Sequence, residues 1–221
     1  MTRVFDPVLR ELRELLLLMG GRAESILDKA VRAVLERDGS LAEQVAADDI
    51  EIDRLDVTID EAVLKALALQ APVAADLREV VAIKMIATDL ERVGDLARNI
   101  AKSAQRLSRR MDVPIPPELA RLAASAQEVL RSSLDAFSQA DPRAAHIVLG
   151  SDDEIDHAQD EVILEELEQI SSHPDMASPA VDIIFIAKNL ERVGDHATNI
   201  AEDVILVAEA RNVKHAAKLG R

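Results

Sequence analysis

The sequence predicts an all-α protein of six helices, arranged as two tandem antiparallel three-helix bundles. Strong helix formers dominate the 221-residue chain, which has only 7 Gly, 8 Pro and 3 Phe and neither Tyr nor Trp. This composition favours helices over sheets. The segment Leu90–Asp95 recurs unchanged as Leu190–Asp195, so the chain contains an internal repeat. Between the breaking residues, the apolar side chains follow helical spacing.

Breaking residues divide the first half of the chain into three helices. The Asp-Gly-Ser segment at residues 38–40 ends a helix expected over residues 7–37. The serine of this segment and Glu43 match a capping box, which would begin the second helix. Pro72 ends the second helix, and a third is expected over residues 73–110.

The second half repeats this pattern after a linker. The only Pro-rich stretch, residues 113–117, is expected to join a first domain of residues 1–112 to a second domain of residues 113–221. Helix four is expected over residues 118–139. We therefore expect each domain to be one three-helix bundle.

The last two helices are bounded by a cap and a proline turn. Asp141 with Pro142 at the first helical position opens helix five. The Ser-Ser-His-Pro segment at residues 171–174 closes it, and helix six is expected to run to about His215. Six helices in two matching sets of three follow from these boundaries.

Charge and composition exclude several functions. The net charge of −15 and the scarcity of aromatic residues disfavour nucleic-acid binding. The absence of cysteine excludes disulfides, thiolate metal sites and cysteine catalysis. The apolar run at residues 15–19 is too short to span a bilayer, and no export signal is apparent, so a cytoplasmic location is expected.

Acidic pairs at i, i+4 spacing lie on the second, third, fifth and sixth expected helices. Folding each helical hairpin back at Pro72 or at residues 172–174 places the two pairs of each half level with each other, on the outside of the bundle. The eight residues are Asp49, Asp53, Glu91 and Asp95 in the first half, and Asp152, Asp156, Glu191 and Asp195 in the second.

Four carboxylates brought together in this way repel one another, and a multivalent cation would remove the penalty. Because every donor is an oxygen, the expected ions are hard ones, namely Mg²⁺, Mn²⁺, Ca²⁺ or iron. Gly94 and Gly194 lie within helices, where each costs about 1 kcal/mol relative to Ala. Their presence in both halves indicates a local requirement such as close backbone approach.

Two alternatives remain open for the acidic pairs. They can form ordinary solvated faces, or Arg92 and Arg192 can hold them in internal salt bridges. The protein would then be a metal-independent acidic adaptor. An oxygen-activating carboxylate–iron enzyme is a further alternative, although such sites usually need an E-x-x-H motif projecting into the bundle. No catalytic constellation, cofactor motif or glycine-rich phosphate loop is apparent.

The repeated motif resembles that of the PhoU family. The resemblance rests on L-E-R-V-G-D-x-A-x-N-I-A at residues 90–101 and 190–201, on residues 70–78, on Met19-Gly20 and on the duplicated three-helix layout. It covers nearly the whole chain. The family's E(D)-x-x-x-D motifs match the eight acidic residues, and the resemblance implies metal binding there, with multinuclear iron clusters in some members. Asn189 and Gln159 replace Asp89 and Asp56, so the number of ions is expected to differ between the halves.

The resemblance also implies a function. PhoU-like proteins are cytoplasmic negative regulators of phosphate uptake and of the phosphate-starvation response. The expected partners are the ATPase subunit of the phosphate ABC transporter and a sensor histidine kinase, with the membrane approached only through these partners. A homodimer is expected, and no enzymatic activity.

Overall fold

The computed structural model describes residues 5–110 and 113–214. In these ranges it contains helices, turns and loops and no strand. The first three helices are α1 (Asp6–Leu35), α2 (Gly39–Gln70) and α3 (Ala74–Leu107). The second set comprises α4 (Pro117–Gln139), α5 (Pro142–Leu149), α6 (Asp152–Ser172) and α7 (Ala177–Glu209), with a 3₁₀ turn η1 (Pro174–Met176) before α7.

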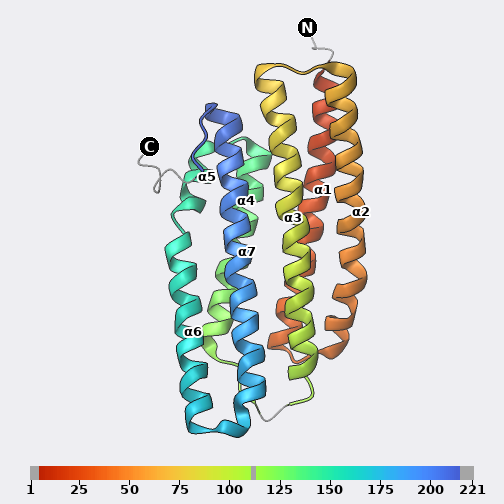
Figure 1. The fold of residues 1–221 in the computed structure, drawn as a ribbon. Coiled ribbons are helices and arrows are strands. Elements are labelled where there is room, and N and C mark those ends of the chain that lie inside the picture. The colour runs from red at the N-terminus through yellow and green to blue at the C-terminus, as the bar shows by residue number, and fades with distance from the viewer. Residues whose placement is uncertain (1–4, 111–112, 215–221) are drawn as a thin grey trace.

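The helices form two bundles that lie side by side. Figure 1 shows α1, α2 and α3 in one bundle and α4 to α7 in the other, with α3 and α7 adjacent at the centre. The predicted all-α fold of two antiparallel three-helix bundles is therefore confirmed. One core of aliphatic side chains runs through both bundles, so how far the predicted domains of residues 1–112 and 113–221 fold independently stays a prediction.

The fifth predicted helix is interrupted. The chain turns at Gly150 and Ser151, whose backbone N–H groups bond to the carbonyl oxygens of Ile147 and Val148, three residues earlier. The result is two helices, α5 and α6, where the first half has the single helix α2. Glycine and serine are weak helix formers, and sequence analysis did not give their pairing enough weight.

Two further helix boundaries differ from expectation. Asp38, rather than the predicted Ser40, caps α2, because its carboxylate accepts hydrogen bonds from the backbone N–H groups of Ser40 and Leu41. The corresponding prediction for Asp141 is confirmed, since its carboxylate accepts from two N–H groups of α5. Helix α7 ends at Glu209, and the predicted endpoint His215 lies outside the described residues.

Polar contacts fix the central pair of helices, α3 and α7. Arg106 donates from Nε to Asp182 Oδ1 at 2.8 Å. Near the middle of the same pair, Asp89 Oδ1 lies 2.7 Å from His196 Nδ1 and 3.2 Å from Asn199 Nδ2. These contacts set the register of the two bundles, and with it the position of the two repeated motifs.

Candidate metal centre

The two repeated motifs lie on the helices at the centre of the molecule, and each faces the preceding helix of its own half. In the first half, α2 and α3 carry Asp49, Asp53, Glu91 and Asp95, which we call the first patch. In the second half, α6 and α7 carry Asp152, Asp156, Glu191 and Asp195, which we call the second patch.

Two mid-helix glycines allow the helices of each hairpin to approach closely. A Cβ atom built on Gly94 would lie 2.7 Å from Asp49 Oδ1 and 3.1 Å from Ile52 Cδ1. A Cβ atom on Gly194 would lie 2.8 Å from Ile155 Cδ1. Real Cβ atoms essentially never come closer than 3.0 Å, so an alanine at either position would force a neighbouring side chain to shift, in agreement with the close approach expected from the sequence.

The acids of the first patch influence one another. Burial raises the pKa of Glu91, and the negative charges of Asp95, Asp56 and Asp53 raise it further. Burial likewise raises the pKa of Asp49, with Asp53 and Asp95 adding to the effect. The hairpin at Pro72 therefore brings acids of α2 and α3 into one electrostatic environment, as the sequence indicated.

One member of this patch is not on the outside of the bundle. The side chain of Asp49 is only 3% exposed and lies against α3. Asp53 is exposed, and Glu91 and Asp95 are half-buried. The prediction that all four carboxylates face outward is therefore wrong for Asp49, because close packing at Gly94 draws the start of the acidic stripe into the helix interface.

Arginines bind much of the first patch. Arg92 Nη1 lies 3.0 Å from Asp95 Oδ2, and Arg92 Nε lies 3.3 Å from Glu91 Oε2. Arg98, which sequence reasoning missed, places Nη1 2.6 Å from Asp49 Oδ2 and binds Asp95 with Nη2. The predicted internal salt bridges are thus present in this half, and its most buried acid is among those bound.

Asp56 and Asp60, which continue the acidic stripe along α2, are held separately. Lys84 on α3 lies 3.1 Å from Asp56 Oδ1 and also pairs with Asp60. This lysine balances the charge of the two carboxylates next to the patch. The sequence contained a signal for these ion pairs, because folding at Pro72 places the basic residue Lys84 level with two acids of the preceding helix.

The second patch has the same arrangement of acids, but it lacks the ion pairs that arginines form in the first patch. Burial raises the pKa of Glu191, and the charges of Asp195, Asp156 and Asp152 add to it. Burial is also the largest cause of the raised pKa values of Asp152 and Asp195. No ion pair joins these carboxylates to a basic side chain among the described residues, and Arg192 acts on Glu191 and Asp195 only through its charge.

The donor chemistry of both patches suits a hard cation, because every candidate ligand is a carboxylate oxygen. Within residues 5–110 and 113–214, however, no three Asp, Glu or His side chains already converge on a common point as metal ligands do. Cation binding would therefore require these partly exposed side chains to change rotamer.

Sequence reasoning also missed an E-x-x-H segment, residues 154–157 on α6. The side chain of His157 is 79% exposed, and Glu154 is exposed as well. The segment therefore points away from the bundle interior, unlike the ligands of helical di-iron enzymes.

The fold and site define a class of duplicated helical-bundle proteins with one carboxylate patch in each half. Comparison with known families is consistent with this description, since the family model "PhoU domain" matches twice, over residues 16–104 and 119–204. The chain belongs to the PhoU family.

Individual relatives match over nearly the full length. A PhoU homolog of the phosphate-specific transport system from Zymomonas mobilis is 36% identical over 211 residues, covering 96% of this chain and 89% of that protein. The Rhizobium meliloti homolog is 38% identical over 208 residues, covering 92% and 86% respectively. The crystal structure of PhoU from Pseudomonas aeruginosa superposes with a TM-score of 0.91 at 34% identity, covering 94% of this chain and 100% of that one.

None of the described helices combines the length and the apolar character that crossing a bilayer requires.

Proposed function

We propose that this chain is a negative regulator of phosphate uptake and of the phosphate-starvation response. The observation that carries the proposal is the full-length similarity to proteins named as accessory proteins of the phosphate-specific transport system. The chain would act as an adaptor in the cytoplasm between the ATPase subunit of the phosphate ABC transporter and a sensor histidine kinase. No catalytic step is assigned to it.

The regulatory proposal has a direct genetic test. Deleting the gene should leave phosphate-starvation genes expressed in phosphate-rich medium, and should raise phosphate uptake measured with labelled phosphate. Returning the intact gene should restore repression. Normal repression in the deletion strain would contradict the proposal.

We further propose that the acidic patches hold hard metal cations, with iron, Mn²⁺, Mg²⁺ and Ca²⁺ as candidates. The support is the set of eight carboxylates, whose mutual repulsion is greatest where no arginine pairs with them. A bound cation would supply positive charge that neutralises a patch and draws its two helices together. The chain's own residues would supply the oxygen ligands and, through Gly94 and Gly194, the close helix approach.

Elemental analysis of protein purified without chelator tests this second proposal. We expect bound metal in the native chain and a loss of most of it in the variant Asp53→Asn, Glu91→Gln, Asp156→Asn, Glu191→Gln. Removal of these ligands should weaken binding by more than about 100-fold, the upper end for outer-shell partners of metal sites. A matched control, Glu61→Gln with Glu168→Gln, changes two exposed acids outside the patches and should keep the metal.

A metal-independent adaptor is the second candidate, and the first patch favours it. Arg98 and Arg92 already neutralise much of the acidic charge there. If the quadruple variant and the native chain carried equal amounts of metal while the variant lost repression, the acids would act by binding basic surfaces of partners.

A further inference from the structure

A buried carboxyl group in the second bundle lacks a partner. Five acidic side chains are classed as buried among the described residues, and four of them pair with a basic side chain. The pairs are Asp49 with Arg98, Glu79 with Arg13, Asp182 with Arg106, and Asp203 with Lys214. The fifth, Glu166 on α6, is only 5% exposed and has neither an ion pair nor a side-chain hydrogen bond.

Glu166 occupies a position that is apolar in the first half. The core residues Ile52 and Ile59 of α2 correspond to Ile155 and Val162 of α6, and the same register aligns Val63 with Glu166. Packing therefore does not require a carboxyl group here. A buried charge without a partner costs several kcal/mol, so a cationic partner bound beside Glu166 would stabilise its ionised form.

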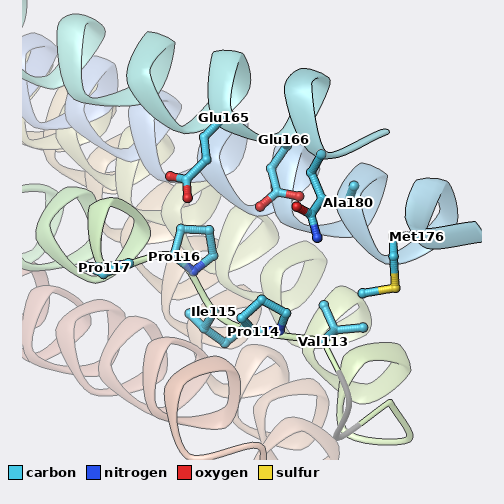
Figure 2. Close-up of a pocket in the computed structure, with 10 residues that line it drawn as sticks. Val113, Pro114, Ile115, Pro116, Pro117, Glu165, Glu166, Met176 and Ala180 are labelled. Carbon is cyan, nitrogen blue, oxygen red and sulfur yellow. The ribbon is translucent and has the colours of Figure 1, made fainter. Parts of the chain in front are cut away.

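The carboxyl group of Glu166 points into a cavity beneath the linker. Figure 2 shows Glu165 and Glu166 extending from α6 towards the linker prolines, with Met176 and Ala180 at the side. The cavity has a volume of about 110 Å³, well above the roughly 10–15 Å³ that one water molecule needs. We call it the linker pocket, and it is lined by residues 113–117, Glu165, Glu166, Gln169, Met176 and Ala180.

The wall of the linker pocket offers Glu166 few hydrogen-bond donors. Pro114, Pro116 and Pro117 have no backbone N–H, and the N–H of Val113 bonds to the carbonyl of Arg110. The remaining side chains are apolar except for Glu165 and Gln169. Because Glu166 has no hydrogen bond to any of these groups, an occupant of the pocket can supply the donor for its carboxylate.

Charge and hydration narrow the chemistry of that occupant. Glu165 adds a second acidic group, and burial together with the charge of Glu118 on α4 raises its pKa, so the surroundings favour a cation. The mostly apolar walls favour a weakly hydrated cation, and guanidinium is more weakly hydrated than ammonium. A guanidinium group already contacts one residue of the pocket wall, since Arg110 Nη2 lies 3.8 Å from the Sδ atom of Met176.

We propose that the linker pocket binds the guanidinium group of an arginine side chain from a protein partner, with Glu166 as its acceptor. The site is independent of the metal proposal. Glu166 lies ten residues from Asp156 along α6, which is about 15 Å at the helical rise. Binding there would join the linker, α6 and the start of α7, and would thus couple a partner to the junction of the two bundles.

Nuclear magnetic resonance titration with methylguanidinium tests the site. Burial, and then the charge of Glu165, raise the pKa of Glu166 to about 7, so the titration belongs at pH 8, where the carboxylate is ionised. We expect saturable shifts of the Ile115 and Gln169 amide signals, with a Kd on the order of 1 mM for so small a ligand. Methylammonium should bind more weakly.

Variants make the titration specific. Glu166→Gln should weaken binding by roughly 30-fold or more, the effect of removing one partner of a buried charge pair. Glu166→Val restores the residue type of the first half and should abolish binding while keeping the circular dichroism spectrum. Glu168→Gln, an exposed neighbour on α6, should bind as the native chain does.

The outcomes separate the alternatives. Equal shifts in the native chain and in Glu166→Gln, or no saturation at pH 8, would overturn the site and leave a proton as the partner of Glu166. To identify the source of the guanidinium, N-acetyl-arginine methylamide is compared with free arginine, whose carboxylate Glu165 would repel. Tighter binding of free arginine would overturn the assignment to a protein side chain.

Discussion

The two acidic patches share a sequence motif but differ in how their charge is balanced. In the first patch, Arg98 on α3 binds Asp49 and Asp95, and Arg92 adds contacts to Glu91 and Asp95. In the second patch, the residue at the position of Arg98 is Thr198, whose hydroxyl donates to the backbone carbonyl of Asp195. The repeated motif thus keeps the arrangement of the acids in both halves without keeping the charge around them.

This difference has a physical consequence for cation binding. A cation entering the first patch must displace the Arg98 guanidinium from Asp49, and it is repelled by the guanidinium it displaces. The second patch has no such competitor, and its acids have pKa values raised by burial and by one another. If the patches bind metal, the second should bind it more tightly.

Exchanging the residues at positions 98 and 198 tests this comparison and should give the largest effect. Thr198→Arg should place a guanidinium beside Asp195 and weaken cation binding at the second patch by about tenfold or more, since one displaced charge-assisted contact is worth about 1.5–3 kcal/mol. Isothermal titration calorimetry with Mn²⁺ measures the change. Thr198→Ala controls for the loss of the hydroxyl group.

The reverse exchange, Arg98→Thr, should act on both stability and binding. It leaves Asp49 buried without a partner, and we expect a loss of about 1–3 kcal/mol in the free energy of unfolding without metal. Added Mn²⁺ should restore about 2.7 kcal/mol at 100 times the Kd. A variant that is as stable as the native chain, and that Mn²⁺ does not stabilise further, would show that Arg98 does not act as an internal cation.

The positions of the two patches were largely predictable from the sequence, because they follow from local motifs and from the internal repeat. The duplication, the proline turns and the i, i+4 acids placed all eight candidate ligands on the correct hairpins. The roles of Gly94 and Gly194 followed from their cost within a helix. Each inference used only helical geometry and a turn position.

The features that were not predicted from the sequence depend mostly on tertiary contacts. Arg98 lies outside the i, i+4 pattern, and its role follows from the depth of Asp49, which only the close approach at Gly94 reveals. Glu166 looked like any exposed glutamate of an acidic helix. Its alignment with Val63 in the repeat was the available signal. The break at Gly150 had a local signal, but strong helical periodicity on both sides concealed it.

The paired glycines sharpen the comparison in terms of stability. Gly94→Ala would press a methyl group against the carboxylate of Asp49, which Arg98 holds in place. Gly194→Ala would meet Ile155, with Cδ1 at 2.8 Å and Cγ2 at 3.3 Å, and no charged group. We expect Gly94→Ala to destabilise the protein by up to about 2 kcal/mol, because an overpacking cost of about 1–3 kcal/mol is reduced by a gain of about 1 kcal/mol in helix propensity.

Urea unfolding of both glycine variants measures the difference. Gly194→Ala should lose less than about 1 kcal/mol, because rotation of Ile155 relieves part of the clash and the propensity gain offsets the rest. If the two variants lost equal stability, the idea that Arg98 holds Asp49 in place against Gly94 would fail.

The smallest effect concerns the pH dependence of stability. Because the pKa of Glu191 is raised in the folded chain by burial and then by Asp195 and Asp156, the folded state binds this proton more tightly than the unfolded state does. The stability that this proton contributes is present below the unfolded pKa of about 4.3 and is lost as pH rises through the higher folded pKa. Glu191→Gln should therefore stabilise the metal-free protein at pH 7 and leave its stability nearly unchanged at pH 4, where the glutamate is largely protonated in both states.

Glu91→Gln provides the matched measurement in the first half. The pKa of Glu91 is also raised by burial and by Asp95, but Arg92 opposes these effects through a contact at 3.3 Å. Glu91→Gln removes the surface ion pair with Arg92, which is worth up to about 1 kcal/mol. The gain in the free energy of unfolding at pH 7 should therefore be smaller than for Glu191→Gln. Thermal unfolding at both pH values, with chelator present, decides the order. A larger gain for Glu91→Gln would mean that the arginines of the first patch do not offset its repulsion, and the proposed difference between the patches would then rest on Asp49 alone.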